Sequence, residues 1–98
     1  MREIQMREKS IEQALVKAVK ERGGICPKFV TPSFDGMPDR LVLLPHGKAG
    51  FVEVKAPGKK PRPLQLARQR LLTELGFGAY VLDDAEKIGG ILDAVQAS

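Results

Sequence analysis

The sequence predicts an α/β fold in which helices flank a mixed β-sheet, with the element order α-β-β-β-α-β-α. The chain opens with a long amphipathic segment, continues with three apolar runs separated by turn-forming residues, and ends with two helical segments around a last short apolar run. A hairpin followed by a crossover helix and another strand is typical of a mixed sheet with helices on its faces. The 98 residues, 43% of them hydrophobic, predict one domain over 1–98.

The first half of the chain begins with a helix expected over residues 4–22. Its apolar residues gather near one face, and Gly23-Gly24 is the expected stop; these residues are Ile4, Ile11, Leu15, Ala18 and Val19. Residues 25–30 predict the first strand, and the turn formers of 31–38 predict a loop.

Two further strands are expected over 39–44 and 50–55 because both segments are short and mainly apolar. The residues between them, Pro45-His46-Gly47-Lys48, are turn formers, which predicts a hairpin. His46, the only histidine, is interpreted as a turn residue rather than a catalytic one.

The second half of the chain continues with a basic loop over 56–62. A helix is predicted over 63–76, since proline favours the first helical position and glycine the end. The last strand is expected over 79–82, and the last helix over 85–95 with an interruption at Gly89-Gly90.

Composition excludes several classes of protein. The single cysteine, Cys26, cannot form an internal disulfide or a cysteine-rich zinc site, and we interpret it as a small semi-buried hydrophobic residue. No apolar run approaches the roughly 20 residues of a membrane span, and the first residues are too polar for a signal peptide. We therefore expect a protein of the cytoplasm with no membrane partner.

The most informative motif is Pro38-Asp39 followed, one hairpin later, by Glu53-Val54-Lys55. Because side chains alternate across a strand, Glu53 and Lys55 are expected on one face of the sheet. Burying such a pair on an apolar sheet is costly unless it has a function. Pro-Asp alone is common in turns, but the hairpin should bring Asp39 and Glu53 close together at one end of adjacent strands.

Two carboxylates and one ammonium are what a metal-dependent phosphodiesterase needs. Mg²⁺ prefers oxygen ligands and is usually held by one or two carboxylates plus substrate phosphate. Asp39 and Glu53 would supply the carboxylates, and the Val54 carbonyl a further ligand. Lys55 would orient the attacking water or stabilise charge on the phosphate.

Two carboxylates of the first helix fall inside its apolar arc. Glu8 and Glu12 are neighbours on one helix face, where a helix that only packs would carry Leu or Ala. The functional hypothesis is that Glu12 adds a third carboxylate to the site. The alternative is that one or both lie at the helix edge, exposed to solvent or paired with Lys9 or Arg62.

Basic residues surround the motif in the sequence, which has a net charge of +4. We expect Lys59, Lys60, Arg62 and Arg68 to contact a phosphate backbone, although a solvated basic surface is the alternative. Gln65 lies in the first turn of the following helix, where anions are favoured, and is either a substrate contact or an ordinary helix-start residue.

Taken together, the chain resembles the PD-(D/E)XK nuclease superfamily, and most closely its VRR-NUC family. The resemblance covers nearly the whole chain and rests on Ile11-Glu12 with Leu15-Val16, on residues 36–40, on residues 51–58, and on Pro63-Leu64-Gln65. It implies that five residues match the active-site positions of the family. These are Glu12, Asp39, Glu53, Lys55 and Gln65, whereas Glu8 is left as a neighbour of the site.

The resemblance also implies a function. We expect a Mg²⁺- or Mn²⁺-dependent DNA endonuclease that resolves four-way (Holliday) junctions as a homodimer in a bacterial or phage-infected cell. A flap or duplex endonuclease with the same site is one alternative. A catalytically inactive DNA-binding module is another, although all five positions carry competent residues.

Overall fold

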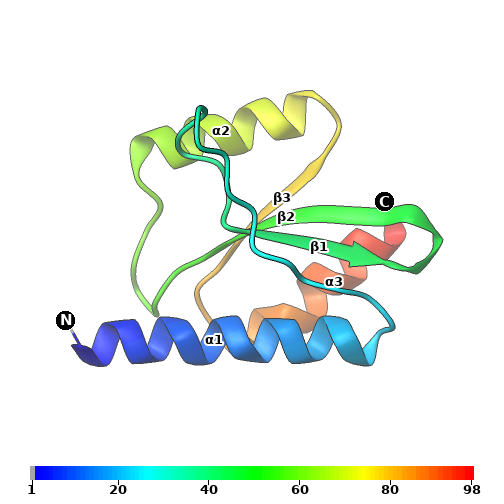
Figure 1. Ribbon diagram of the computed structural model, residues 1–98, viewed down its shortest axis with the longest axis horizontal. Helices are drawn as coiled ribbons and strands as arrows, with labels where there is room; N and C mark the ends of the chain where they lie inside the picture. Colours follow the sequence, from blue (N-terminus) through cyan, green and yellow to red (C-terminus); the bar gives the residue numbers. More distant parts are fainter. Residues whose placement is uncertain (1) are drawn as a thin grey trace.

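The computed structural model describes the backbone of residues 2–98 and the side chains of residues 7–98. It confirms the predicted fold class, a mixed sheet of three strands flanked by helices (Figure 1). The elements are α1 (Arg2–Glu21), β1 (Arg40–Leu44), β2 (Lys48–Val54), α2 (Pro63–Glu74), β3 (Gly78–Leu82) and α3 (Ile88–Ala97). The predicted place of Ile4 on the apolar helix face concerns a side chain outside the described residues.

The sheet has the strand order β1-β2-β3. Strands β1 and β2 are antiparallel, with Arg40 opposite Val52, and a short 3₁₀ turn over Pro45–Gly47 joins them. Strands β2 and β3 are parallel, with Glu53 opposite Val81. A parallel pair needs a crossover connection, and α2 supplies it.

The core lies between one face of the sheet and the helices α1 and α3. Alternate strand residues face the core, and each helix contributes one apolar stripe. The buried residues are Ile11, Leu15, Val19, Cys26, Val42, Leu44, Val52, Val54, Leu82, Ile88, Ile91, Leu92 and Val95. Helix α2 lies on the opposite face, where it meets the other set of strand side chains.

The strand predicted over 25–30 is reduced to two isolated bridges, which pair Ile25 with Leu43 and Lys28 with Arg40. The segment still runs antiparallel to β1, since the Leu41 N–H donates to the Pro27 carbonyl at 3.0 Å. Pro27 has no N–H to return, so the ladder is interrupted at its centre. The observed element order is therefore α-β-β-α-β-α with a bridged segment beside β1.

The predicted interruption at Gly89-Gly90 is wrong. Both glycines lie inside α3, and the break comes earlier, between a 3₁₀ turn over Ala85–Lys87 and the start of α3 at Ile88. Each glycine costs a helix about 1 kcal/mol. Burial of four apolar side chains on the other face, each worth about 1.5–3 kcal/mol, outweighs that cost.

Helix α1 ends at Glu21, and the predicted stop, Gly23-Gly24, caps it. Gly23 has φ +85° and its N–H donates to the Lys20 carbonyl at 3.0 Å, while the Gly24 N–H donates to the Val19 carbonyl at 3.0 Å. This pair of bonds caps the free carbonyls of the last turn and turns the chain back toward β1. Among the residues that the structure describes, none of the helices is both long enough and apolar enough to cross a membrane.

Candidate active site

Glu53 of strand β2 and Lys55, which follows the strand directly, lie on the face opposite the core. The core face of the strand carries Val52 and Val54, which are 0% and 2% exposed. Glu53 is itself only 5% exposed, and its Oε2 lies 3.4 Å from Nζ of Lys55. The alternation expected from the sequence therefore places an acid and a base side by side in a nearly dry environment.

Asp39 lies immediately before β1 and reaches across to the end of β2. Its Oδ1 accepts a hydrogen bond from the Val54 N–H at 3.1 Å. The preceding Pro38 is fully buried, which fixes the entry of the chain into the strand. The hairpin thus brings the Asp39 carboxylate next to the strand that carries Glu53.

Arg68 of α2 anchors the loop that leads to Asp39. Its Nε donates to the Asp35 carbonyl at 2.7 Å, and its guanidinium lies 3.8 Å from the centre of the Phe34 ring. The sequence predicts a DNA contact for Arg68, whereas the structure engages its guanidinium within the chain. A contact with DNA would have to share these bonds.

Gln65 connects helix α2 to the buried carboxylate. Its Nε2 donates to Glu53 Oε2 at 2.9 Å, and its Oε1 accepts from the Arg62 N–H at 2.8 Å. The side chain is 6% exposed, so both ends of the amide are used inside the protein. Gln65 holds Glu53 in position, and it does not face solvent as a phosphate contact at a helix start would.

Glu12 lies at the edge of the site, where Arg40 binds it. Its Oε2 is 3.0 Å from Arg40 Nε, and Arg40 Nη1 donates to the Cys26 carbonyl at 2.8 Å. Glu12 and Glu8 are both close enough to Asp39 to raise the pKa of its carboxyl. Two of the three predicted carboxylates are therefore close to the end of β2, and the third is held beside them by an arginine.

Sequence reasoning did not assign a role to Arg40. A signal for it was present, because Arg40 has the same strand parity as Val42 and Leu44 and so points toward the apolar face covered by α1. Glu12 falls inside the apolar arc of the facing helix. Two charges that are out of place on facing elements predict an ion pair.

Burial and mutual repulsion disfavour ionisation of the two central carboxylates. Burial is the largest cause that raises the pKa of Asp39, with the Glu12 charge adding to it and the Val54 hydrogen bond opposing it. Burial also raises the pKa of Glu53, the charge of Asp39 adds to the rise, and Lys55 lowers it. The site concentrates negative charge that one nearby ammonium only partly offsets.

The donor set fits a divalent cation held by two carboxylates. Asp39 and Glu53 are hard oxygen donors, and Mg²⁺ commonly takes one or two protein carboxylates and completes its shell with water and substrate oxygens. Among residues 7–98, however, the structure does not gather three or more His, Cys, Asp or Glu side chains into a group that could hold a metal. Glu12 is turned toward Arg40, so its role as a third ligand stays a prediction.

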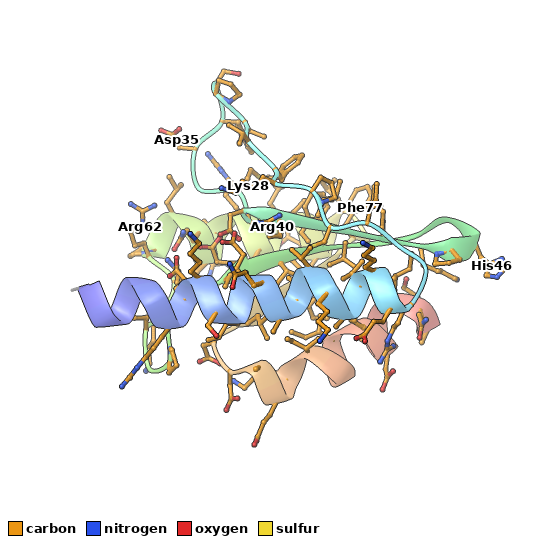
Figure 2. The ribbon with its side chains drawn as sticks, turned by 60° about the horizontal axis from the view of Figure 1, so that its bottom comes forward. Lys28, Asp35, Arg40, His46, Arg62 and Phe77 are labelled. Carbon is orange, nitrogen blue, oxygen red and sulfur yellow. The ribbon has the colours of Figure 1, made fainter. Side chains whose placement is uncertain are left out.

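The remaining predicted residues lie in the loop before α2 and in the turn between β1 and β2, where Figure 2 labels Arg62 and His46. Lys59, Lys60 and Arg62 are exposed in the loop before α2, so they are open to a ligand. His46 has φ +70° at the tip of the turn between β1 and β2, at the far end of the molecule from Arg62 and Arg40. This confirms His46 as a turn residue and separates it from the site.

Cys26 is a core residue, as the sequence suggests. It is 7% exposed, and burial raises the pKa of its thiol to about 11. A thiol in this state is a poor nucleophile.

Comparison with known proteins identifies the family. No family model matches the chain. A protein named "Putative nuclease p44" from Acyrthosiphon pisum secondary endosymbiont phage 1 is 52% identical over 90 residues, which are 92% of this chain and 96% of that protein. A solved structure described as a VRR_NUC domain is similar with a TM-score of 0.82 and 26% identity, over 89% of this chain and 95% of that one. With its fold, this places the chain in the VRR-NUC family of nucleases.

Proposed function

We propose that this nuclease is a divalent-metal-dependent, structure-selective DNA endonuclease that resolves four-way junctions as a homodimer. The observation that carries the metal-dependent hydrolysis is the arrangement of Asp39, Glu53 and Lys55. The buried Glu53 carboxylate lies beside the Lys55 ammonium, and the half-buried Asp39 carboxylate is bonded to the Val54 N–H between them in the chain; both carboxyls have raised pKa values. Groups whose pKa values are shifted by burial and by a specific charged neighbour cluster at functional sites.

Asp39 and Glu53 would hold Mg²⁺ or Mn²⁺, with the Val54 carbonyl and Glu12 as further ligands. A bound divalent cation polarises a phosphoryl oxygen and lowers the pKa of a coordinated water. The Val54 N–H already fixes one Asp39 oxygen, which leaves the other free to bind the cation. Glu12 would reach the cation only after its bond to Arg40 is released or shared.

Lys55 and Gln65 have different roles in this proposal. The Lys55 ammonium neutralises part of the charge on Glu53 and would stabilise the negative charge that builds on the phosphate during hydrolysis. Gln65 is a positioning residue, because it fixes the Glu53 carboxylate through a hydrogen bond and does not itself face solvent.

A branched substrate and a homodimer are supported by chemistry rather than by contacts. One active site cuts one strand at a time, so two symmetry-related sites suit a junction in which two strands are cut. Two-fold dimers are the commonest oligomers. The exposed basic loop with Lys59, Lys60 and Arg62 lies beside the site and would bind the phosphate backbone near it, with Arg68 behind it on α2.

Substitution of Lys55 tests the proposal. We expect Lys55→Ala to lower the single-turnover rate of junction cleavage in Mg²⁺ by about 10²–10³-fold or more. Binding of the junction and the far-ultraviolet circular dichroism should stay close to wild type. Lys87→Ala, which removes an exposed lysine paired with Asp83, is the matched control and should cleave normally. Near-normal cleavage by Lys55→Ala would contradict the proposed mechanism.

A further inference from the structure

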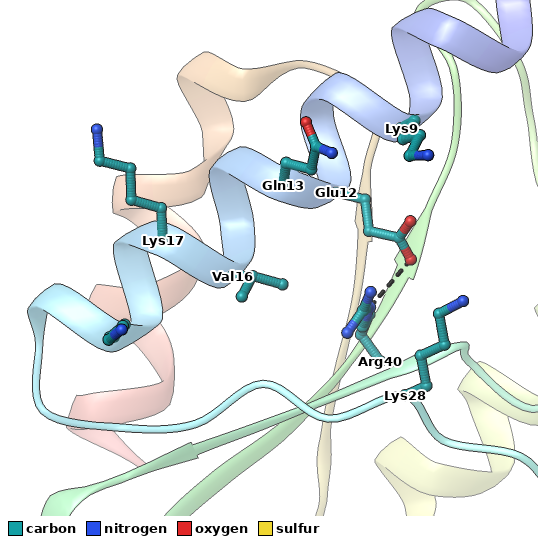
Figure 3. Close-up of a pocket in the computed structure, with 8 residues that line it drawn as sticks. Lys9, Glu12, Gln13, Val16, Lys17, Lys28 and Arg40 are labelled. Carbon is teal, nitrogen blue, oxygen red and sulfur yellow. Dashed lines mark hydrogen bonds and ion pairs between the residues drawn. The ribbon is translucent and has the colours of Figure 1, made fainter.

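A groove runs between helix α1 and the segment that bridges to β1 (Figure 3). Its volume is about 580 Å³. We call it the α1 groove, and the residues that line it are Lys9, Glu12, Gln13, Val16, Lys17, Lys20, Lys28 and Arg40. Apart from Glu12, none of these residues was predicted from the sequence to bind a ligand.

The α1 groove carries an excess of positive charge. Five of its residues are cationic, and Glu12 is its one carboxylate, which Arg40 already binds. Within the part of the chain whose side chains are described, the four lysines have no ion-pair partner. Their charges are therefore available to an anionic ligand, whereas those of Lys55, Lys87 and Arg22 are used within the chain.

The lysines form a line rather than a cluster. Residues Lys9, Gln13, Lys17 and Lys20 are three or four positions apart, so they lie along one stripe of the helix. This stripe is about 16 Å long at a rise of 1.5 Å per residue. Lys28 faces it from the opposite wall, and Figure 3 shows the Glu12 carboxylate between Lys9 and Lys28. A linear anion matches this shape better than a compact one.

The α1 groove is continuous with the candidate active site. Glu12 lines it and is close enough to Asp39 to raise the pKa of that carboxyl. Arg40 lines it as well and follows Asp39 directly in the sequence. A chain of phosphates in the groove would therefore end at the carboxylates that would hold the cation.

We propose that the α1 groove binds the phosphodiester backbone of one strand of the DNA that the active site cuts. This deepens the proposed function and rests on it. A strand has one phosphate per 3.4 Å of duplex axis, so a stripe of about 16 Å spans about five phosphates. The lysine stems supply apolar walls, and their ammonium groups contact phosphates without reading sequence. The protein would thus bind junction or duplex DNA through the shape and charge of the phosphate backbone.

Charge removal in the α1 groove tests this proposal. The test variant carries Lys9→Gln, Lys17→Gln and Lys28→Gln. Binding of a labelled four-way junction and of a linear duplex is measured by fluorescence anisotropy in EDTA at several salt concentrations. Loss of three phosphate contacts should flatten the slope of log affinity against log salt by about 2.7. Between 1 M and 0.1 M salt, each lost contact therefore reduces the gain in affinity by roughly 8-fold.

A control variant with the same change in net charge carries Lys48→Gln, Arg70→Gln and Lys87→Gln, which lie outside the α1 groove. Its slope should change by less than about 1, as expected for the loss of at most one phosphate contact. The proposal is overturned if the groove variant keeps the wild-type slope, or if the two variants lose affinity equally. Circular dichroism and thermal unfolding of both variants confirm that the comparison is between folded proteins.

Cleavage separates failure of this inference from failure of the proposed function. At subsaturating protein and in Mg²⁺, the control variant should cleave the junction at the wild-type rate, and the groove variant should cleave it more slowly because it binds the junction more weakly. If the wild-type protein cleaves no DNA, the proposed function is contradicted. The groove proposal would still be supported if only the groove variant shows a flatter slope of log affinity against log salt. If all variants cleave normally and the groove variant keeps the wild-type salt dependence of binding, the groove proposal is overturned and the proposed function stands.

Discussion

Two glutamines one turn apart on α2 should respond in opposite ways to the same substitution. Gln65 uses both ends of its amide, at 2.9 Å to Glu53 and at 2.8 Å from the Arg62 N–H. Gln69 has a buried Nε2 with no hydrogen-bond partner among the described residues. Gln65→Leu should therefore destabilise the protein, and Gln69→Leu should not.

The magnitudes follow from the bonds. A hydrogen bond to an ionised group contributes about 1.5–3 kcal/mol, and a helix N-terminal cap typically about 1 kcal/mol. Gln65→Leu should lower the free energy of unfolding by about 2–4 kcal/mol, which for a domain of this size lowers Tm by at least about 8 °C. Gln69→Leu removes an unpaired buried donor and should raise the free energy of unfolding by about 1 kcal/mol, or Tm by about 4–8 °C.

Urea unfolding of both variants and the wild type, at neutral pH in EDTA, gives the two free energies. A second measurement tests whether Gln65 positions Glu53 rather than only stabilising the fold. The Mg²⁺ concentration for half-maximal junction cleavage should rise about 10–100-fold in Gln65→Leu and stay unchanged in Gln69→Leu. Equal effects of the two substitutions on stability, or an unchanged Mg²⁺ requirement in folded Gln65→Leu, would refute the reasoning.

Two further predictions concern the carboxylates and the core. The folded state raises the pKa of Asp39 and Glu53, so it binds protons at these carboxyls more tightly than the unfolded state does. The stabilisation from this proton binding is fully present below about pH 4, and it is lost as the pH rises through the raised pKa values. Asp39→Asn should thus be more stabilising, relative to wild type, at pH 7 than at pH 4 in metal-free urea titrations; the reverse order would contradict the pKa direction. Leu15 of α1 is 0% exposed, so Leu15→Ala should lower the free energy of unfolding by about 2–5 kcal/mol. Leu75 is 64% exposed, so Leu75→Ala should lower it little in the same assay.

The sequence predicted the fold class because hydrophobic periodicity and turn chemistry agree over most of the chain. The hairpin, the crossover helix and the last strand form where proline, glycine and alternating apolar residues place them. Two elements differed. Residues 25–30 have the composition of a strand, but Pro27 withholds one ladder hydrogen bond. Gly89-Gly90 resembles a helix stop, yet the apolar stripe of α3 overrides two weak helix formers.

The centre of the site was also within reach of sequence, because strand parity puts Glu53 beside Lys55 and a hairpin brings Asp39 next to β2. The other hydrogen-bond and ion-pair partners of these residues could not be predicted from the sequence. Contacts such as Gln65 to Glu53 depend on how helix and sheet pack, and propensity does not encode that distance. The α1 groove was missed because its lysines are spread along a helix and gain a facing wall only when the chain folds.

The most direct test of the central claim is cleavage of a labelled synthetic four-way junction, beside linear duplex and flap DNA, in Mg²⁺, Mn²⁺ or EDTA. We predict paired, symmetric cuts in the junction with either metal, none in EDTA, and weaker cutting of the other substrates. Cleavage confined to duplex or flap DNA would contradict junction selectivity while retaining the active site. Cleavage that persists undiminished in EDTA, or binding without any cleavage, would contradict metal-dependent hydrolysis at Asp39 and Glu53.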